Sequence, residues 1–423
     1  MLARALAAFL ARKGVHYGWV MVGLTFLTTL STASVMGLVG VLILPLKTEF
    51  GWDLSSISGA LGLRLMLFGL VAPFAAAFMA RYGVQRIVAL ALALVVAGVG
   101  LATVMTQLWQ LWIFWGLLVG LGTGMTAMVL GATVAGRWFT ARRGLVVGLL
   151  TASNATGQLL FLPMVAWMAD HFGWRVAVLP PLGACLLAWT LMTLLGREYP
   201  SQLGLPPYGE KSVLPPTVVP RGNPFARSFS VLLEAAGVPM FWLLFFTFFV
   251  CGLSTNGLIQ SHFIPLCHDF GMEDVAAAGV LAMMGAFDFI GTIGSGWLSD
   301  RVDNRWLLFM YYGLRGLSLL VLPYTSFSFY GLSLFAVFYG LDWIATVPPT
   351  VRLAGTIFGR EKAPLVFGWV FTAHQLGAAT AAAGAGMVRD FSGSYLPAFF
   401  AAGAMCVVAA VAVVMVRIRP ASV

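Results

Sequence analysis

The chain consists of long apolar runs separated by short polar gaps, and the runs are long enough to cross a membrane. A transmembrane helix needs about 20 mainly apolar residues, and these runs lack the alternation of a membrane β-barrel. The pattern therefore predicts an all-α membrane protein. It predicts twelve transmembrane helices, at residues 17–45, 55–79, 87–105, 109–135, 144–168, 174–196, 238–266, 275–299, 306–323, 331–358, 364–388 and 395–416.

One long polar stretch interrupts the series after the sixth span. Residues 198–236 are rich in Pro and Gly and too polar to cross a membrane, which is typical of a linker. We expect a short surface helix near its end, around residues 228–235. The predicted domains are an N-terminal six-helix half (1–197), a cytoplasmic linker (198–236) and a C-terminal six-helix half (237–423). Two six-helix halves are typical of transporters.

Composition agrees with the membrane assignment and argues against an enzyme. Hydrophobic residues make up 60% of the chain and charged residues 9%, whereas a soluble domain has about 25% charged residues. The four cysteines are scattered, with no spacing typical of a metal site or a disulfide framework. No nucleotide-binding loop or nucleophile motif occurs. We therefore expect no enzymatic activity, no cofactor and no metal.

The net charge of +9 is explained by topology rather than by nucleic-acid binding. With the N-terminus in the cytoplasm, 18 of the 24 Lys and Arg residues lie in inside loops and termini, three in outside loops and three within spans. Basic residues are enriched on the cytoplasmic side of membrane proteins. The bias predicts a multi-pass protein of the cell's inner membrane with both termini cytoplasmic. We expect it to be monomeric.

The loops after spans two and eight resemble the loop motif of the major facilitator superfamily, Gly-x-x-x-Asp-Arg-x-Gly-x-Arg. The second loop, from Gly296 to Arg305, matches it except at Asp303, which replaces the second glycine. The first loop has Ala80 in place of the aspartate and keeps Arg81, Gly83 and Arg86. The resemblance covers essentially the whole chain and implies the superfamily's fold. It also implies a gating role for the loop motif, weaker in the first half.

Three further segments resemble monocarboxylate transporters and their bacterial oxalate/formate-type relatives. They are His16–Val20 in span one, Trp138–Gly148 in span five and Ala286–Asp288 in span eight. The family places an arginine one helical turn after the span-eight aspartate to bind the substrate carboxylate. Here that position is Thr292. The resemblance therefore supports a role for Asp288 but leaves open which residue binds an anion.

Five charged residues lie more than one helical turn inside predicted spans, where an unpaired charge costs about 2.5–3.5 kcal/mol. They are Arg64, Asp288, Arg315, Asp342 and Arg352. At 1.5 Å per residue, the first four lie near the depth where transporters hold their substrate. Each therefore needs a partner, water or a functional role.

Asp288 is the predicted proton-coupling residue, because a carboxyl group in a low-dielectric setting favours its protonated form. The alternative is a structural ion pair with Arg315. For Arg315 itself, the alternatives are pairing with Asp288 or Asp342 and direct contact with an anionic substrate. Arg64 comes from the half without an intramembrane acid. We expect it to bind a substrate carboxylate or, alternatively, the carbonyl groups at the broken helix end near Pro73 or a group of span eleven.

The remaining predicted site residues are gating or structural ion pairs and neutral polar groups. Asp342 precedes Pro348 and Pro349, which kink a helix, and Arg352 lies toward the inner end of the same span. With Asp300 and Arg301 of the loop motif, they are predicted to form gating or structural ion pairs. The neutral polar residues predicted to contribute to the substrate site are Asn154, Gln158, Asn256, Gln260, Thr292 and His374.

Together these features predict a secondary active transporter of a small organic anion, with a monocarboxylate as the favoured substrate, coupled to protons and working by alternating access. The alternative is a proton-coupled exporter or importer of a neutral, aromatic or hydrophobic solute. Span five lacks the Gly-Pro pair of drug antiporters, which argues against the exporter. The expected partners are the substrate, protons and the lipid bilayer.

Overall fold

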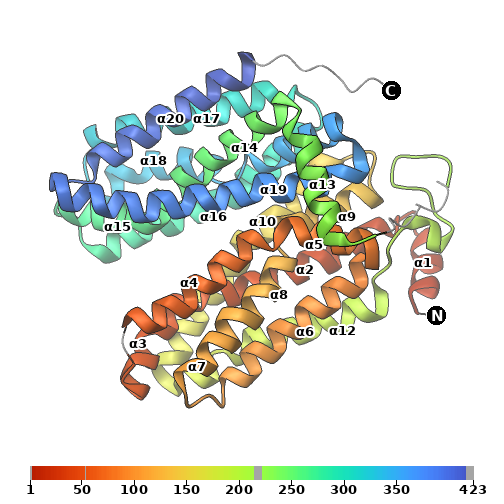
Figure 1. Ribbon diagram of the computed structural model, residues 1–423, viewed down its shortest axis with the longest axis horizontal. Coiled ribbons are helices and arrows are strands. Elements are labelled where there is room, and N and C mark those ends of the chain that lie inside the picture. Colours follow the sequence, from red (N-terminus) through yellow and green to blue (C-terminus); the bar gives the residue numbers. More distant parts are fainter. Residues whose placement is uncertain (1, 53, 214–221, 416–423) are drawn as a thin grey trace. The chain divides into compact units, whose positions relative to one another are not determined.

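The computed structural model describes residues 2–52, 54–213 and 222–415, and some helical side chains within these ranges are not described. The described chain forms two compact units (Figure 1). Unit 1 comprises Met1–Val146 and Ser153–Phe229. Unit 2 comprises Val147–Ala152 and Ser230–Val423.

Unit 1 is a bundle of long helices, several of which are broken within a span. In order, its helices are α1 (Leu2–Arg12), α2 (Gly18–Gly37), α3 (Val39–Phe50), α4 (Leu54–Leu70), α5 (Ala72–Tyr82), α6 (Val84–Ala102), α7 (Leu108–Leu111), η1 (Trp112–Val119), α8 (Gly120–Met125), α9 (Met128–Trp138), α10 (Arg143–Phe172), α11 (Trp174–Ala177), α12 (Leu179–Leu195) and η2 (Pro200–Leu203). Within the second span the chain bends by 54° between α4 and α5. Pro73 lies at the start of α5, where proline is well tolerated because its missing N–H is not needed. Helix α12 packs against α2 and α6.

Unit 2 is a second helical bundle. Its helices are α14 (Pro239–Gly252), η3 (Leu253–Ile259), α15 (Gln260–Asp269), α16 (Asp274–Ser299), α17 (Asn304–Val321), η4 (Leu322–Tyr324), α18 (Phe329–Asp342), α19 (Val347–Ser392) and α20 (Leu396–Met415). The main packing pairs are α17 with α20, α14 with α19, and α16 with α18. A Cβ atom added at Gly252 would lie 1.8 Å from the carbonyl oxygen of His374. Small residues of this kind allow helix backbones to approach closely.

The helices are consistent with the twelve predicted spans. Within the described residues, nine helical segments are long and apolar enough to cross a membrane, and the bent pair in span two raises the number to ten. One of the nine, Phe329–Arg389, covers two predicted spans and is interrupted at Gly359, where φ is 75°. Helix α10, with 30 residues, covers the predicted fifth span. The chain is therefore an all-α, multi-pass membrane protein.

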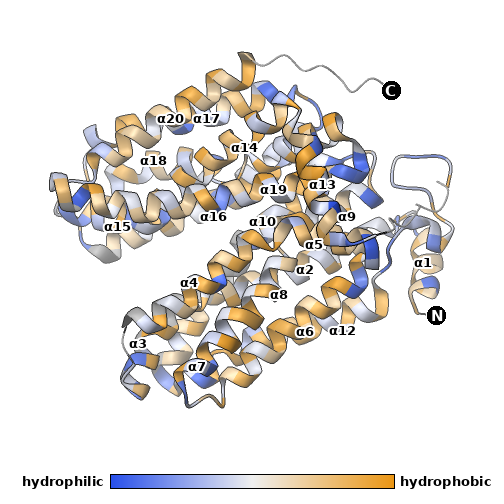
Figure 2. Ribbon diagram, in the orientation of Figure 1, coloured by the Kyte–Doolittle hydropathy of each residue, from blue (hydrophilic) through white to orange (hydrophobic). Residues whose placement is uncertain are grey.

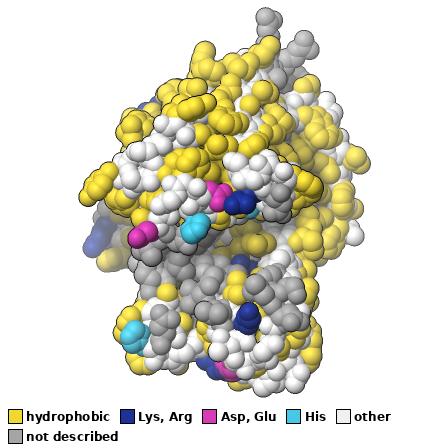
Figure 3. Space-filling view, turned by 90° about the vertical axis from the view of Figure 1, so that its left-hand side faces the viewer, with side chains coloured by type: hydrophobic (Ala, Val, Ile, Leu, Met, Phe, Trp, Pro, Cys, Tyr) yellow, Lys and Arg dark blue, Asp and Glu magenta, His cyan; other side chains and the backbone are white. Residues whose placement is uncertain are grey.

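Hydrophobic residues prevail along the helices, and hydrophilic residues gather near helix ends and loops (Figure 2). Hydrophobic side chains also cover much of the surface visible in Figure 3, with few charged groups among them. Lipid tails are themselves apolar, so an exposed apolar surface of this extent is expected for helices that face a bilayer.

The first part of the predicted linker folds back onto unit 1. The Tyr208 N–H donates to the Trp138 carbonyl oxygen at 2.8 Å, and a ring nitrogen of His16 lies 2.9 Å from the Pro206 carbonyl oxygen. The predicted surface helix is present as α13 (Pro224–Ala236), which is longer than expected. Residues 214–221, between these parts, lie outside the described residues.

Candidate functional site

A break between α18 and α19 organises the polar groups of unit 2. Pro348 and Pro349 lack a backbone N–H, so the carbonyl groups four residues earlier, those of Ile344 and Ala345, lose their helical partners. The Ala345 carbonyl oxygen instead accepts a hydrogen bond from the Ser295 hydroxyl. The Val347 N–H donates to the Ile344 carbonyl oxygen, and the Trp343 carbonyl oxygen accepts a hydrogen bond from the Arg315 guanidinium at 3.0 Å. Side chains of α16 and α17 thus satisfy a broken backbone that would otherwise be costly at this depth.

Asp288, on α16, binds the same break. Its side chain is 1% exposed, and Oδ1 accepts hydrogen bonds from the Ile344 N–H at 3.0 Å and the Thr292 hydroxyl at 2.8 Å. Thr292, one turn along α16, thus stands where the resemblance places an arginine and donates to the aspartate. The ion pairs formed between described residues do not include Asp288. Its carboxyl group is therefore buried among neutral donors.

Arg315 pairs with Asp342. From the sequence alone, Asp288 and Asp342 were alternative partners of Arg315. Nε lies 2.8 Å from Asp342 Oδ2, and both side chains are almost completely buried. The other nitrogens donate to Cys251 Sγ at 3.1 Å and to the Asp342 and Trp343 carbonyl oxygens. All three guanidinium nitrogens therefore have protein partners. Asp342 Oδ1 is buried and has no hydrogen-bond partner among the described residues.

Arg64, on α4 of unit 1, lies in a different environment. It is 2% exposed, and its two terminal nitrogens donate to the carbonyl oxygens of Val35 and Met36, each at 3.3 Å. These contacts are near the long end of the range for such bonds. Nε is buried without a partner among the described residues. Among the described residues, Arg64 forms no ion pair. Its positive charge therefore has no acidic partner among them.

Of the other predicted gating residues, Asp300 and Arg301 directly follow α16, and Arg352 lies in α19. Arg352 forms an ion pair with Asp300 at 2.9 Å. Arg301 does not join it: its guanidinium lies over the Trp297 ring, 4.0 Å from the centroid, and donates to the Trp297 carbonyl oxygen. Asp300 of the loop motif, directly after α16, is therefore paired with a cation on α19.

The neutral polar residues lie in varied positions. His374 is 6% exposed, packs against the rings of Phe248 and Phe371, and has a buried Nδ1 without a partner among the described residues. Asn256 is half-buried in the π-helical η3, whereas Gln260 is exposed at the start of α15. The wider turn of a π-helix changes the register between these two. Asn154 is half-buried in α10, and the Gln158 side chain lies outside the described residues.

The sequence did not single out Glu198, which has several partners in unit 1. Its carboxylate accepts from the backbone N–H groups of Val84 and Gln85 at the start of α6, and it pairs with Arg137 at 3.1 Å. A negative charge is favourable at a helix N-terminus. The absence of an acid at Ala80 was the available signal, but it did not indicate that Glu198 carries the missing negative charge. Cys251 and Ser295 were also missed, because neither belongs to a sequence motif.

We expect Glu198→Ala to lower the free energy of unfolding by about 2–4 kcal/mol, because it removes a helix cap and leaves the half-buried Arg137 unpaired. Denaturant unfolding of the purified protein measures this loss. The matched control is Glu234→Ala, which removes a more exposed ion pair with Lys362 and should cost less than about 1 kcal/mol. Equal losses in the two variants would contradict a structural role for Glu198.

Comparison with known proteins identifies the family. The model of the Major Facilitator Superfamily matches residues 24–382. The chain is 26% identical over 394 residues to the uncharacterized MFS-type transporter YcxA of Bacillus subtilis (strain 168), covering 91% of each chain. It is 26% identical over 393 residues to monocarboxylate transporter 13 of Rattus norvegicus, covering 92% of this chain and 86% of the relative.

Solved structures show the same fold. The E. coli fucose:proton symporter FucP matches with a TM-score of 0.70 at 15% identity, covering 95% of this chain and 99% of that chain. The proton:xylose symporter XylE matches with a TM-score of 0.70 at 13% identity, covering 93% and 94%. The relatives and structural neighbours are transporters, not enzymes. The chain therefore belongs to the major facilitator superfamily and is a multi-pass membrane transporter of that family.

Proposed function

We propose that the protein transports a small organic anion, most simply a monocarboxylate, together with a proton by alternating access. The observation that carries the proposal is Arg64, a buried cation with a spare donor and no acidic partner among the described residues. A guanidinium can bind a carboxylate through two parallel hydrogen bonds. The names of the monocarboxylate transporter relatives support the substrate class.

Arg315 is the weaker candidate for anion binding. Its guanidinium is neutralised by Asp342 and also holds the α18–α19 break. A substrate carboxylate would have to displace Asp342 and free these carbonyl groups. If Arg64 binds the substrate anion and Arg315 has a structural role, fewer protein contacts must be broken than in the reverse assignment.

Asp288 is the proposed proton carrier. It is buried without a cationic partner among the described residues, and its two donors are a hydroxyl group and a backbone N–H. A buried carboxyl group that is not held in an ion pair is free to bind and release a proton during a transport cycle. We propose that both termini lie in the cytoplasm and that the protein resides in the inner membrane, as the distribution of basic residues indicates.

Uptake into proteoliposomes tests the substrate class. Labelled lactate, pyruvate, oxalate and aromatic acids would be offered with and without an inward proton gradient. The proposal expects saturable uptake of a monocarboxylate that is accelerated by the gradient. Uptake that ignores the gradient would contradict proton coupling, and uptake of neutral solutes alone would contradict the anion assignment.

For Asp288→Asn we expect loss of accumulation driven by the proton gradient, with exchange of labelled for unlabelled substrate retained. Asparagine keeps the Oδ1 acceptor for Ile344 and Thr292 but cannot titrate. The matched control is Asp269→Asn, which removes a charge from the exposed pair with Arg389 and should leave accumulation unchanged. Gradient-driven accumulation by Asp288→Asn at the wild-type level would rule out Asp288 as the proton carrier.

The second candidate is a transporter of a neutral or aromatic solute. The observation in its favour is Thr292, which hydrogen-bonds Asp288 at the position where the monocarboxylate transporter resemblance places an arginine. A neutral hydrogen-bonded pair can bind a hydroxyl-bearing solute without a charge. The same uptake panel, extended with neutral analogues, separates the two candidates.

A further inference from the structure

The N-terminal helix α1 has an exposed side that combines large apolar and basic residues. Leu2 is 61% exposed and Phe9 is 51% exposed, and Ala3 is the buried residue of the helix. A helix of 11 residues is marginally stable in water by itself. Since α1 is strongly amphipathic but buries little against the described protein, its exposed side needs a partner.

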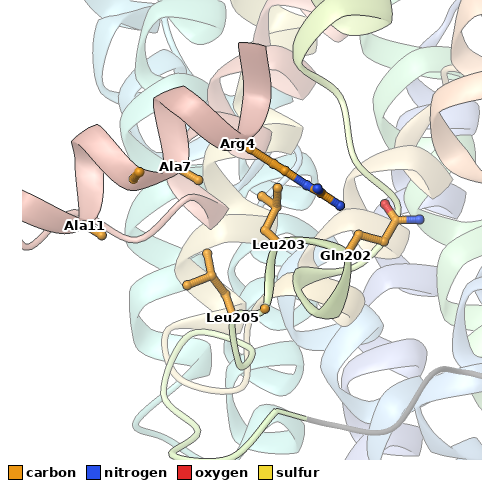
Figure 4. A pocket seen from close by; sticks show the side chains of 8 residues that line it. Arg4, Ala7, Ala11, Gln202, Leu203 and Leu205 are labelled. Carbon is orange, nitrogen blue, oxygen red and sulfur yellow. The ribbon is translucent and has the colours of Figure 1, made fainter. Parts of the chain in front are cut away.

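The exposed residues of α1 divide between two faces. At about 100° per residue, Leu2, Ala5, Phe9, Arg12 and Lys13 form one face, called here the outer face. Arg4, Ala7, Ala8 and Ala11 form another, the pocket face, which lines a pocket of about 400 Å³ with residues 202–205 (Figure 4). Figure 4 shows the Arg4 side chain extending toward Gln202. Arg4 is thus directed toward the protein, while the two other cations lie on the outer face.

The outer face has the chemistry of a membrane-surface helix. Lys13 Nζ lies 4.8 Å from the centroid of the Phe9 ring, so an aromatic group and a cation are adjacent. The first acidic residue of the chain is Glu49, so α1 has no negative charge of its own. Large apolar groups flanked by Lys and Arg are typical of helices that lie in the headgroup region, and basic residues attract anionic lipids.

The position of α1 within unit 1 fits this partner. Helix α1 packs against α12, which forms the sixth span, and it runs across the direction of α6 and α12 rather than along it (Figure 1). A helix that crosses the end of a transmembrane span lies in the plane of the bilayer surface. The apolar side chains of its outer face can then reach the acyl boundary while the cations stay among the headgroups.

We propose that α1 is an interfacial helix that binds a bilayer surface containing anionic phospholipid. Leu2 and Phe9 insert below the headgroups, and Arg12 and Lys13 bind headgroup phosphates. Leu2 and Phe9, which are largely exposed in the protein, are then buried in lipid. This role is independent of the transported substrate.

The test uses the full-length protein in nanodiscs of phosphatidylcholine alone or mixed with phosphatidylglycerol. An environment-sensitive fluorophore is attached to Ala5→Cys on the outer face or to Ala11→Cys on the pocket face, since all four native cysteines are buried. Spin-labelled lipid then reports contact by quenching. We expect strong quenching at position 5 in anionic nanodiscs, weaker quenching at high salt, and little quenching at position 11.

Matched charge variants complete the test. Arg12→Gln combined with Lys13→Gln should remove most of the difference between anionic and neutral nanodiscs at position 5. Arg4→Gln, a loss of one positive charge on the pocket face, should preserve it. Equal quenching at positions 5 and 11, or no quenching at position 5 in anionic nanodiscs, would overturn the proposal. An unchanged lipid preference in the double variant would do the same.

Discussion

Arg64→Gln is expected to raise the half-saturating concentration of a monocarboxylate by at least about thirty-fold. Truncating one partner of a buried, hydrogen-bonded charge pair costs about 2–5 kcal/mol, and Arg64 is a buried cation with two long hydrogen bonds to carbonyl oxygens and one nitrogen without a partner among the described residues. Arg64→Lys should recover only part of the affinity, because lysine keeps the charge but loses the planar fork of donors. Initial rates of uptake into proteoliposomes measure both effects.

A neutral substrate analogue separates a binding role of Arg64 from a structural one. In the wild-type protein, lactate should be strongly preferred over lactamide, which has the same shape without the charge. In Arg64→Gln that preference should disappear. Thermal unfolding provides the control, since the two long bonds to Val35 and Met36 predict only a modest loss of stability. Wild-type preference for lactate in Arg64→Gln would assign the anion site to another residue.

Asp342→Asn is expected to lower the free energy of unfolding by about 3–5 kcal/mol. The substitution leaves the Arg315 guanidinium buried without an opposite charge, and breaking a buried ion pair from one side has a cost of this size. The change is almost isosteric, so lost packing contributes little. Denaturant unfolding of the purified protein gives the value.

A double-mutant cycle tests whether the loss arises from the pair. Arg315→Gln combined with Asp342→Asn should lose less than the sum of the two single variants, because neither charge is then left alone. The exposed pair of Arg389 and Asp269 is the control, and Asp269→Asn should cost less than about 1 kcal/mol. A loss below about 1 kcal/mol in Asp342→Asn would show that Arg315 finds sufficient compensation elsewhere.

Sequence reasoning predicted the membrane-spanning architecture because that architecture is set by the lengths of apolar runs. It also predicted that Arg315, Asp288 and Asp342 needed partners, since charges at membrane depth are costly. It could not decide between the two acids for Arg315. Counting residues along a helix gives a depth, whereas a pairing also depends on how each helix is rotated and where it breaks. The break after Asp342 turns two carbonyl groups toward Arg315, and this determines the pairing.

Glu198 illustrates a second limit. Its partners are separated from it by 61 to 114 residues along the chain, so no local pattern connects them. The absence of an acid at Ala80 indicated that a charge was missing from the first loop motif. Nothing in the local sequence indicated that the replacement would come from the segment after span six. Similarly, no sequence motif indicated the π-helical turns of η1 and η3.

The π-helical segment η3 lets the seventh span hold one residue more than a regular helix without turning its buried side outward. A π-helical turn holds more residues than an α-helical turn, so deletion of one residue between Leu253 and Ile259 would allow a regular α-helix. The lost residue and the tighter turn have opposite effects on the rotation of the helix, so α15 would keep nearly the same orientation relative to α14. Phe263, Leu266 and Cys267 would then stay in the interior in which they are buried. A change of one residue in the length of η3 should therefore disturb the seventh span less than the same change within α14 or α15.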